Sequence, residues 1–426
     1  MRPNFVFILA DDLGYADLGC YGGRASPSCS PNLDRMAAEG LRFTDGYANS
    51  SVCSPSRFAL ITGRWQYRLR GGADEPVAKR ARGNPELGLP PAHPTMPSLL
   101  RDAGYSTGLV GKWHLGFPPH FGPLQSGYQE YFGVMSGGVD YFTHCDSAGI
   151  HDLFEGETEV DRPGYLTDLI SDRAVDYIGR QQGKAPFMLS VHYTAPHWPW
   201  ETREDEAVAK SIAKIIHTDG GSVPTYLEMI RQMDEGIGRI LAALKATGAD
   251  KDTIVVFTSD NGGERFSDTW PLTGKKMDLL EGGIRVPYIV RWPAQVAAGG
   301  TTPQMAITMD LTRTVLGAAG AGFADAKLEG IDLLPLLKTA APPLDRTFFW
   351  RAVYQGREEK AARSGAWKVF LDDGIQMLFD VTRDPGERHD TAAEHPDIVA
   401  RLKAQIEAWE KDVDAEASAL HKPARN

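Results

Sequence analysis

Residues 4–12, with the sequence NFVFILADD, form a continuous apolar run that ends at two carboxylates, Asp11 and Asp12. Such a run predicts a β-strand buried on both faces, as in parallel sheets that are covered by helices. Similar runs lie at 253–258 and 286–292, with helical patterns between them. The chain is therefore predicted to be an α/β protein with a large, mostly parallel sheet flanked by helices.

Between these strands the apolar residues recur with helical spacing, and glycines stand where helices should end. We predict helices at 32–39, 96–103, 166–182 and from about 222 to 247, and further strands at 105–110 and 186–192. The longest of these helices carries one apolar stripe from Tyr226 to Leu244 and ends before Gly248. This spacing is typical of a helix packed on a sheet.

The composition changes near residues 340–343, AAPP, which we interpret as a linker. We therefore predict a catalytic domain at 1–340 and a small C-terminal α+β subdomain at 341–426. Short strands are expected at 347–351, 367–371 and 377–381, in an antiparallel sheet. A helix from Pro396 to about Val413 should pack on that sheet with its apolar face.

The bulk properties exclude several classes of partner. The 426-residue chain has a net charge of −11, which argues against nucleic acid because phosphate binding needs a basic surface. No apolar segment approaches the roughly 20 residues of a membrane span, and the first apolar run lacks the layout of a signal peptide. We expect a cytoplasmic protein, or a periplasmic one if a leader has been removed.

Residues 53–64, CSPSRFALITGR, carry the most specific chemical signal. Because proline is favoured at the first helical position, Cys53 is predicted to be the N-cap of a short helix that Gly63 ends. Backbone N–H groups and the helix dipole would then point at the group on residue 53, which suits an anion such as sulfate. Arg57, one turn on, adds a permanent positive charge. An isolated cysteine would more often be an unreactive buried side chain.

This segment resembles the signature of the formylglycine-dependent sulfatases, C-x-P-S-R followed by L-T-G-R, with Ile61 where leucine is usual. The similarity extends from about residue 3 to about residue 410, because GKWHLG at 111–116, PHWP at 196–199 and EGGIRVP at 281–287 also match. It implies the fold of the alkaline phosphatase superfamily. It also implies that a maturation enzyme oxidises Cys53 to an aldehyde, formylglycine.

Asp260 and Asn261 follow the strand at 253–258, just as Asp11 and Asp12 follow the first strand. Ligands of open α/β sheets bind at the carboxyl ends of strands, so the two pairs should converge. Oxygen ligands favour Ca²⁺ or Mg²⁺ over zinc. Either pair alone would also fit a helix cap or an Asx-turn. The resemblance implies that all four residues, with the converted Cys53, form the calcium site of the family.

The resemblance also implies a catalytic set. Lys112 would bind a sulfate oxygen as a point charge, and His114, two residues on, would move a proton near neutral pH. His197 is implied as a second active-site histidine and Lys276 as a second catalytic lysine. The spacing back from the EGGIR run selects Lys276 over Lys275, and the run itself is expected to form a turn with a buried ion pair. His192, on a strand, is interpreted as structural.

Two further groups of residues are open to two interpretations. The basic stretch Arg64, Arg68, Arg70, Lys79, Arg80 and Arg82 is typical of a solvated loop, although it could attract an anionic substrate. The aromatic residues Tyr141, Phe142, Trp198 and Trp200 either line a pocket for an aromatic or sugar ring or pack in the interior. With Cys53 assigned to chemistry, three cysteines remain, so at least one should be a free thiol.

The sequence therefore predicts a sulfuric ester hydrolase that releases sulfate from an aryl or sugar sulfate ester. Its partners would be that small-molecule or saccharide substrate and the enzyme that generates formylglycine. One alternative is a phosphonate or phosphate ester hydrolase of the same superfamily. Another is a non-catalytic binder of sulfated glycans in which Cys53 stays a thiol.

Overall fold

The computed structural model describes residues 2–25, 27–69, 77, 81–211, 220–339, 342–354 and 356–420. Its large sheet contains β1 (Asn4–Ala10), β2 (Leu41–Phe43), β4 (Ser106–Gly111), β5 (Glu130–Gly133), β6 (Phe154–Glu155), β7 (Thr158–Glu159), β8 (Phe187–His192), β9 (Thr253–Ser259), β10 (Tyr288–Arg291) and β11 (Gly300–Thr302). In the described part of the chain these strands lie in the order β11-β2-β10-β9-β1-β8-β4-β5-β6-β7.

The middle of this sheet is parallel. Strands β9, β1, β8, β4 and β5 all run in the same direction. Strand β10 is antiparallel to both of its neighbours, β9 and β2, so the sheet is mixed. The prediction of a large, mostly parallel sheet is confirmed.

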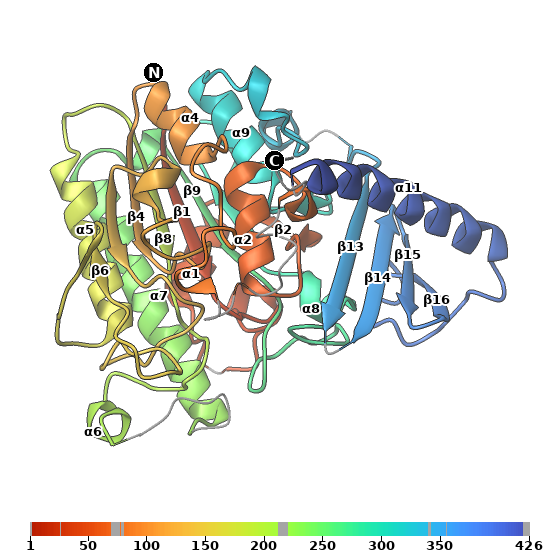
Figure 1. The fold of residues 1–426 in the computed structure, drawn as a ribbon, viewed down its shortest axis with the longest axis horizontal. Coiled ribbons are helices and arrows are strands. Elements are labelled where there is room, and N and C mark those ends of the chain that lie inside the picture. Colours follow the sequence, from red (N-terminus) through yellow and green to blue (C-terminus); the bar gives the residue numbers. More distant parts are fainter. Residues whose placement is uncertain are drawn as a thin grey trace, which may run out of the picture.

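The two faces of the sheet are covered by different helices (Figure 1). The helices α1 (Pro31–Ala38), α5 (Leu166–Arg180) and α7 (Val223–Ala246) pack on one face, and α2 (Cys53–Thr62), α4 (Met96–Asp102) and α9 (Asp310–Ala319) pack on the other. Along β1, Val6 and Ile8 face the first group, and Phe5, Phe7 and Leu9 face the second. Because side chains alternate along a strand, an apolar run fills both cores.

The predicted helices and strands agree with these bounds to within a few residues. The Ser222 side chain accepts a hydrogen bond from Thr225 N and caps α7. The remaining short elements are β3 (Gly46–Tyr47), β12 (Ala306–Ile307), α6 (Glu206–Ala209), α8 (Glu281–Ile284) and α10 (Leu334–Thr339). Every helix among the described residues is too short or too polar to cross a bilayer. All four cysteines are free thiols.

A second, smaller sheet follows near the C-terminus (Figure 1). It is an antiparallel meander of β13 (Thr347–Tyr354), β14 (Arg357–Ser364), β15 (Trp367–Asp372) and β16 (Ile375–Asp380), and α11 (Pro396–Leu420) packs on it. Strand β14 was not predicted, because its sequence REEKAARS lacks the apolar alternation of a strand. The predicted domain boundary at 340–341 lies outside the described residues.

The C-terminal sheet shares one hydrophobic cluster with the large domain. Tyr47 and Trp65 from the large domain pack with Trp350 and Trp409 from the C-terminal part. The indole N–H of Trp350 donates a hydrogen bond of 2.9 Å to the backbone oxygen of Ala48. Since Ala48 lies just before α2, the C-terminal sheet supports the segment that leads into that helix.

Candidate active site

Cys53 is the first residue of α2, and its N-cap is Val52 in an extended conformation. The prediction that Cys53 itself is the N-cap was wrong by one residue. Pro55 is the third helical residue, where its missing N–H costs nothing because the first-turn N–H groups have no acceptor within the helix. Gly63 ends the helix as predicted, with a φ of 66°. Residue 53 thus occupies the positive end of the helix dipole.

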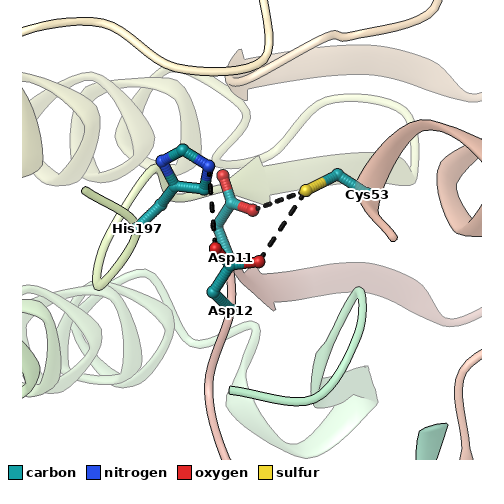
Figure 2. A group of neighbouring side chains, drawn as sticks. All are labelled: Asp11, Asp12, Cys53 and His197. Carbon is teal, nitrogen blue, oxygen red and sulfur yellow. Dashed lines mark hydrogen bonds and ion pairs between the residues drawn. The ribbon is translucent and has the colours of Figure 1, made fainter. Parts of the chain in front are cut away.

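The carboxyl ends of β1 and β9 place their polar residues side by side, because Ala10 pairs with Ser259 in the sheet. Asp11 and Asp12 follow β1 and face the start of α2 (Figure 2). The thiol of Cys53 lies 3.3 Å from Asp11 Oδ1 and 3.8 Å from Asp12 Oδ1. The predicted convergence of the two strand ends is present in the structure, where Asp12 N donates to Asp260 Oδ1 at 3.3 Å.

These side chains could hold one cation. Ligand atoms of Asp11, Asp12, Cys53 and His197 all lie within 4.8 Å of one another. The Asn261 amide nitrogen lies 2.7 Å from Asp12 Oδ1, while its oxygen is buried and has no hydrogen-bond partner among the described residues. Rotating the amide group of Asn261 by half a turn would place its oxygen beside Asp12 Oδ1, so that both oxygens could bind one cation. The oxygen-rich set fits a hard divalent ion.

Each carboxylate of the site already contacts at least one positively charged side chain. Lys112 Nζ lies 2.5 Å from Asp11 Oδ2, and Lys276 Nζ lies 2.7 Å from Asp12 Oδ2. Burial by itself would raise the pKa of Asp12, but the charges of Lys276, His197 and Lys112 hold it below its usual value. Lys276 is therefore the lysine that enters the site, whereas its neighbour Lys275 is exposed.

Arg57 is buried beneath these carboxylates. Its Nη2 lies 2.8 Å from Asp260 Oδ2, and its Nη1 donates a 3.2 Å hydrogen bond to the backbone oxygen of Lys112. Burial and the charge of Asp11 raise the pKa of Asp260 to about 6, against the effect of Arg57. His192 Nδ1 lies 3.4 Å from Arg57 Nη1, so this histidine supports the site from below. Arg57 fixes both Asp260 and the end of β4.

The two predicted active-site histidines each have one nitrogen fixed by a backbone oxygen. His197 Nδ1 donates to Trp198 O at 2.6 Å, which leaves Nε2 facing Asp12 Oδ2 at 3.6 Å. His114 Nε2 donates to Val77 O at 2.9 Å, and its buried Nδ1 has no partner among the described residues. Burial, and after it the charge of the nearest lysine, lowers the pKa of both rings. The pKa of His197 falls to about 3. Each neutral ring thus offers a lone pair.

Two glycines that the sequence analysis missed pack against these histidines. A Cβ atom on Gly137 would lie 2.5 Å from His114 Cε1, and one on Gly138 would lie 2.9 Å from His197 Cε1. Both distances are shorter than any normal contact, so only glycine lets the rings approach this segment. Nothing local distinguishes this glycine pair from an ordinary turn.

Among the described residues of the basic stretch, Arg64, Arg68 and Arg82 form ion pairs within the protein and are not part of a solvated loop. Arg64 Nη2 lies 2.7 Å from Glu416 Oε2, and Arg68 Nη2 lies 2.8 Å from Glu329 Oε1. These largely buried arginines therefore fasten α11 to the large domain. Arg82 pairs with Asp146 at 2.8 Å. The predicted members Arg70, Lys79 and Arg80 lie outside the described residues.

Three of the four predicted aromatic residues pack in the interior: Tyr141, Phe142 and Trp200 are buried. The hydroxyl of Tyr141 donates to the backbone oxygens of Thr194 and His197, each at 2.9 Å. Trp198 is half-buried, with its ring centroid 4.8 Å from that of His197. Of this group, Trp198 alone remains a candidate pocket residue.

Comparisons with known proteins find similar proteins of one family along nearly the whole chain. The family model described as Sulfatase matches residues 3–321, and that described as N-sulphoglucosamine sulphohydrolase, C-terminal, matches residues 272–412. The N-acetylgalactosamine-6-sulfatase of Rattus norvegicus is 31% identical over 96% of this chain and 86% of its own length. The arylsulfatase A of Homo sapiens is 31% identical over 97% of this chain and 88% of its own length.

A solved structure shows the same fold. The crystal structure of Ps i-CgsB in complex with k-i-k-neocarrahexaose superposes with a TM-score of 0.87 and 30% sequence identity. The match covers 96% of this chain and 93% of the other. The fold, including the C-terminal sheet, is therefore shared with this solved structure over nearly the whole chain.

Proposed function

Because this chain belongs to the sulfatase family and is a sulfate ester hydrolase, we propose that it acts through a formylglycine at position 53 and a divalent cation. One observation carries the proposal. The side chain of Cys53 stands at the N-terminus of α2, within 3.8 Å of two aspartates at the end of β1. This position suits a nucleophile that must meet both a cation and an anionic ester.

Asp11, Asp12, Asp260 and Asn261, with the converted residue 53, would hold the cation. The donor set favours Ca²⁺, with Mg²⁺ as the alternative. When bound, such an ion would lower the pKa of a hydroxyl on residue 53 and offset negative charge on the ester. Arg57 would keep Asp260 in place, because its guanidinium is 2.8 Å from that carboxylate.

The aldehyde explains why a cysteine stands at this position. Hydration of a formylglycine gives two hydroxyls on one carbon. One hydroxyl can attack sulfur, and loss of the proton from the second hydroxyl can then release sulfate and restore the aldehyde. Serine or threonine could perform only the first of these steps. Conversion needs a maturation enzyme, which we propose as a partner of this chain.

Lys112 and Lys276 would bind the sulfuryl oxygens, and His197 would do so when its Nε2 carries a proton. In the described structure each lysine contacts a single carboxylate, and an ammonium group has three N–H donors, so donors remain for the substrate. Fixed positive charge there would stabilise the charge that develops in the transition state. Lys276, or His197 once its Nε2 has taken up a proton, would protonate the leaving alcohol, and the lone pair on His114 Nδ1 would take the proton of the second hydroxyl.

We propose a sulfated saccharide as the natural substrate. The support comes from relatives: one is an N-acetylgalactosamine-6-sulfatase, and one structural neighbour was solved with a neocarrahexaose. An aryl sulfate should also be hydrolysed, because the groups that contact the reacting sulfate do not depend on the alcohol.

The test compares wild type, coexpressed with a formylglycine-generating enzyme, with Cys53→Ala and the control Cys145→Ala. Sulfate release from 4-nitrophenyl sulfate and from sulfated saccharides is measured by ion chromatography, with 4-nitrophenyl phosphate and phenylphosphonate as comparison substrates. Mass spectrometry of the peptide with residue 53 should show an aldehyde in place of the thiol. Sulfate release by Cys53→Ala at the wild-type rate would refute the mechanism, and faster turnover of a phosphorus ester would refute the substrate class.

A further inference from the structure

A loop at 262–275 leaves the reaction centre and returns to it. Asn261 precedes the loop and Lys276 follows it, and Lys276 N donates to Gly263 O at 2.9 Å. The loop also packs on the turn after Asp12, because Ala16 N donates to Asp268 O at 2.9 Å. Both ends of the loop and its residue Asp268 therefore lie next to the segments that form the reaction centre.

The tip of this loop carries the exposed tryptophan Trp270. Its side chain is 68% exposed, which is the highest value among the exposed large hydrophobic residues in the described ranges. Trp270 lies six residues before Lys276, so their Cα atoms are at most about 20 Å apart. The Arg388 guanidinium lies 5.0 Å from the ring centroid, and Arg388 Nη2 donates to Pro271 O at 2.9 Å. The ring is held in position with a face open to water.

Three exposed arginines contact this loop: Arg24, Arg265 and Arg388. Arg24 donates to the backbone oxygen of Phe266, and the Arg265 guanidinium lies 4.9 Å from the Phe266 ring. Within the described ranges of the chain, none of the three forms an ion pair with a carboxylate. In a protein with a net charge of −11, this is a local concentration of unneutralised positive charge beside the reaction centre.

The acidic residues of the loop do not cancel this charge. Asp268 Oδ1 accepts a hydrogen bond from Trp270 N at 3.0 Å and so helps to fix the tryptophan. Glu264 is half-buried and forms no ion pair with an arginine within the described ranges. An open aromatic ring among arginines has the chemistry to bind an acidic sugar chain, because a sugar ring can stack on an indole while guanidinium groups bind sulfate or carboxylate.

We propose that Trp270, Arg265, Arg388 and Arg24 form a subsite for sugar residues beyond the one that carries the scissile sulfate. The occupant is the continuing chain of a sulfated oligosaccharide, with one ring stacked on Trp270 and acidic groups on the arginines. This inference rests on the proposed action on sulfated saccharides. It adds that the enzyme binds oligosaccharides better than monosaccharides.

The experiment uses the matured full-length enzyme and compares Trp270→Ala and Arg388→Ala with the controls Ile375→Ala and Arg383→Ala. Both control side chains are exposed on the C-terminal subdomain. Substrates are hexasaccharides from carrageenan, chondroitin 6-sulfate and heparan sulfate, their sulfated monosaccharides, and 4-nitrophenyl sulfate. For the hydrolysed hexasaccharide, each test variant should raise KM about tenfold, the effect of one lost stacking or charged contact. Turnover of 4-nitrophenyl sulfate should stay at the wild-type rate.

Binding of the same hexasaccharides to the Cys53→Ala variant is measured separately, by calorimetry. The tightest of them should bind about tenfold more weakly when Trp270→Ala is added. Unchanged KM and affinity in the Trp270 and Arg388 variants would overturn the subsite, as would a wild type that neither binds nor hydrolyses any hexasaccharide. If wild type binds them through Trp270 but releases no sulfate from any ester, the proposed reaction fails while the subsite stands.

Discussion

The protein contains two buried groups of charges that look alike in composition and differ in their contacts. One is the reaction centre, with Asp11, Asp12, Asp260, Arg57, Lys112 and Lys276. The other, which we name the bridge cluster, consists of Asp45, Glu281, Arg285, Arg363, Lys368 and Glu387. Each has three carboxylates and three basic side chains. In the bridge cluster, Lys368 Nζ lies 3.1 Å from Glu281 Oε1 and 2.9 Å from Glu387 Oε1. In the reaction centre, each lysine contacts one carboxylate in the described structure.

This difference separates a structural role from a chemical one. Arg285 and Arg363 of the bridge cluster also contact two carboxylates each, so every charged group of the cluster lies beside a group of opposite charge. The cluster joins α8 in the large domain to β14 and β15 in the C-terminal sheet. In the reaction centre each lysine instead contacts one carboxylate, and an ammonium group has three N–H donors, so donors remain for a sulfate ester. The oxygen of Asn261, which has no hydrogen-bond partner among the described residues, is available to a cation.

Lys368→Met should break the bridge cluster and give the largest effect. Without this lysine, Glu281 and Glu387 would share a buried site with less positive charge, so the free energy of unfolding should fall by about 3–5 kcal/mol. Denaturation with urea measures the change. Activity on 4-nitrophenyl sulfate, assayed well below the melting temperature, should change little.

The matched control is Lys360→Met on β14. Lys360 lies 3.0 Å from Glu410 Oε1 but is partly exposed, so its loss should cost no more than about 1 kcal/mol. Equal destabilisation by the two substitutions would mean that the bridge cluster has no special role in stability.

Lys276→Met tests the chemical role of the reaction centre. If Lys276 uses its remaining donors on the sulfuryl group, its loss should lower kcat/KM on 4-nitrophenyl sulfate by about 10²–10³-fold, as for the loss of one transition-state donor. Stability should change far less, because a bound cation can balance Asp12. Lys275→Met, at the exposed neighbouring position, is the control. A variant that unfolds like Lys368→Met would place Lys276 with the structural ions.

The sequence predicted the members of the reaction centre better than those of the bridge cluster, and the reason is local. Residues such as Asp11 and Asp260 stand directly after apolar strands, so strand prediction alone places them at one edge of the sheet. The EGGIR run predicted the Glu281–Arg285 ion pair, which is present at 3.2 Å. It could not predict Lys368 or Glu387, because their contacts depend on how the C-terminal sheet docks.

The same limit explains the errors at Arg64 and Arg68. Their sequence shows a run of positive charge, but their partners Glu329 and Glu416 are more than 250 positions away. Long-range pairing of this kind leaves no local pattern. The sequence also does not show which glycines make close contacts. At Gly137 the contact is visible only in the structure, as the short distance to the His114 ring.

Gly137→Ala should show that the reaction centre also depends on close packing. The new methyl group would lie 2.5 Å from His114 Cε1, so the ring must move. A displacement of about 1 Å can cost 10²-fold in rate, and we expect kcat to fall by about that factor. Gly122→Ala is the control, because a Cβ there would have no neighbour within 4 Å. Wild-type kcat in Gly137→Ala would show that His114 needs no fixed position.

A third group of residues extends the comparison, because its buried carboxyl groups form no ion pair with a basic side chain within the described ranges. Glu201 accepts a hydrogen bond from Tyr141 N at 3.2 Å and lies beside Asp140. Neither carboxyl group forms an ion pair within the described ranges. Burial and the charge of Asp140 raise the pKa of Glu201 to about 8. A proton on Glu201 thus replaces the lysines and arginines of the other two groups.

This proton makes stability depend on pH in a definite direction. Because the folded-state pKa of Glu201 is above its usual value of 4.5, its contribution is complete below that value and is lost as the pH rises through about 8. From pH 6 to pH 7.5 the loss can reach about 2 kcal/mol, one proton over 1.5 units. Glu201→Gln keeps the shape without the proton, so urea denaturation at the two pH values should show a smaller loss. An equal loss in both proteins would mean that Glu201 is already ionised at pH 6, and that buried carboxylates here tolerate charge without a cation.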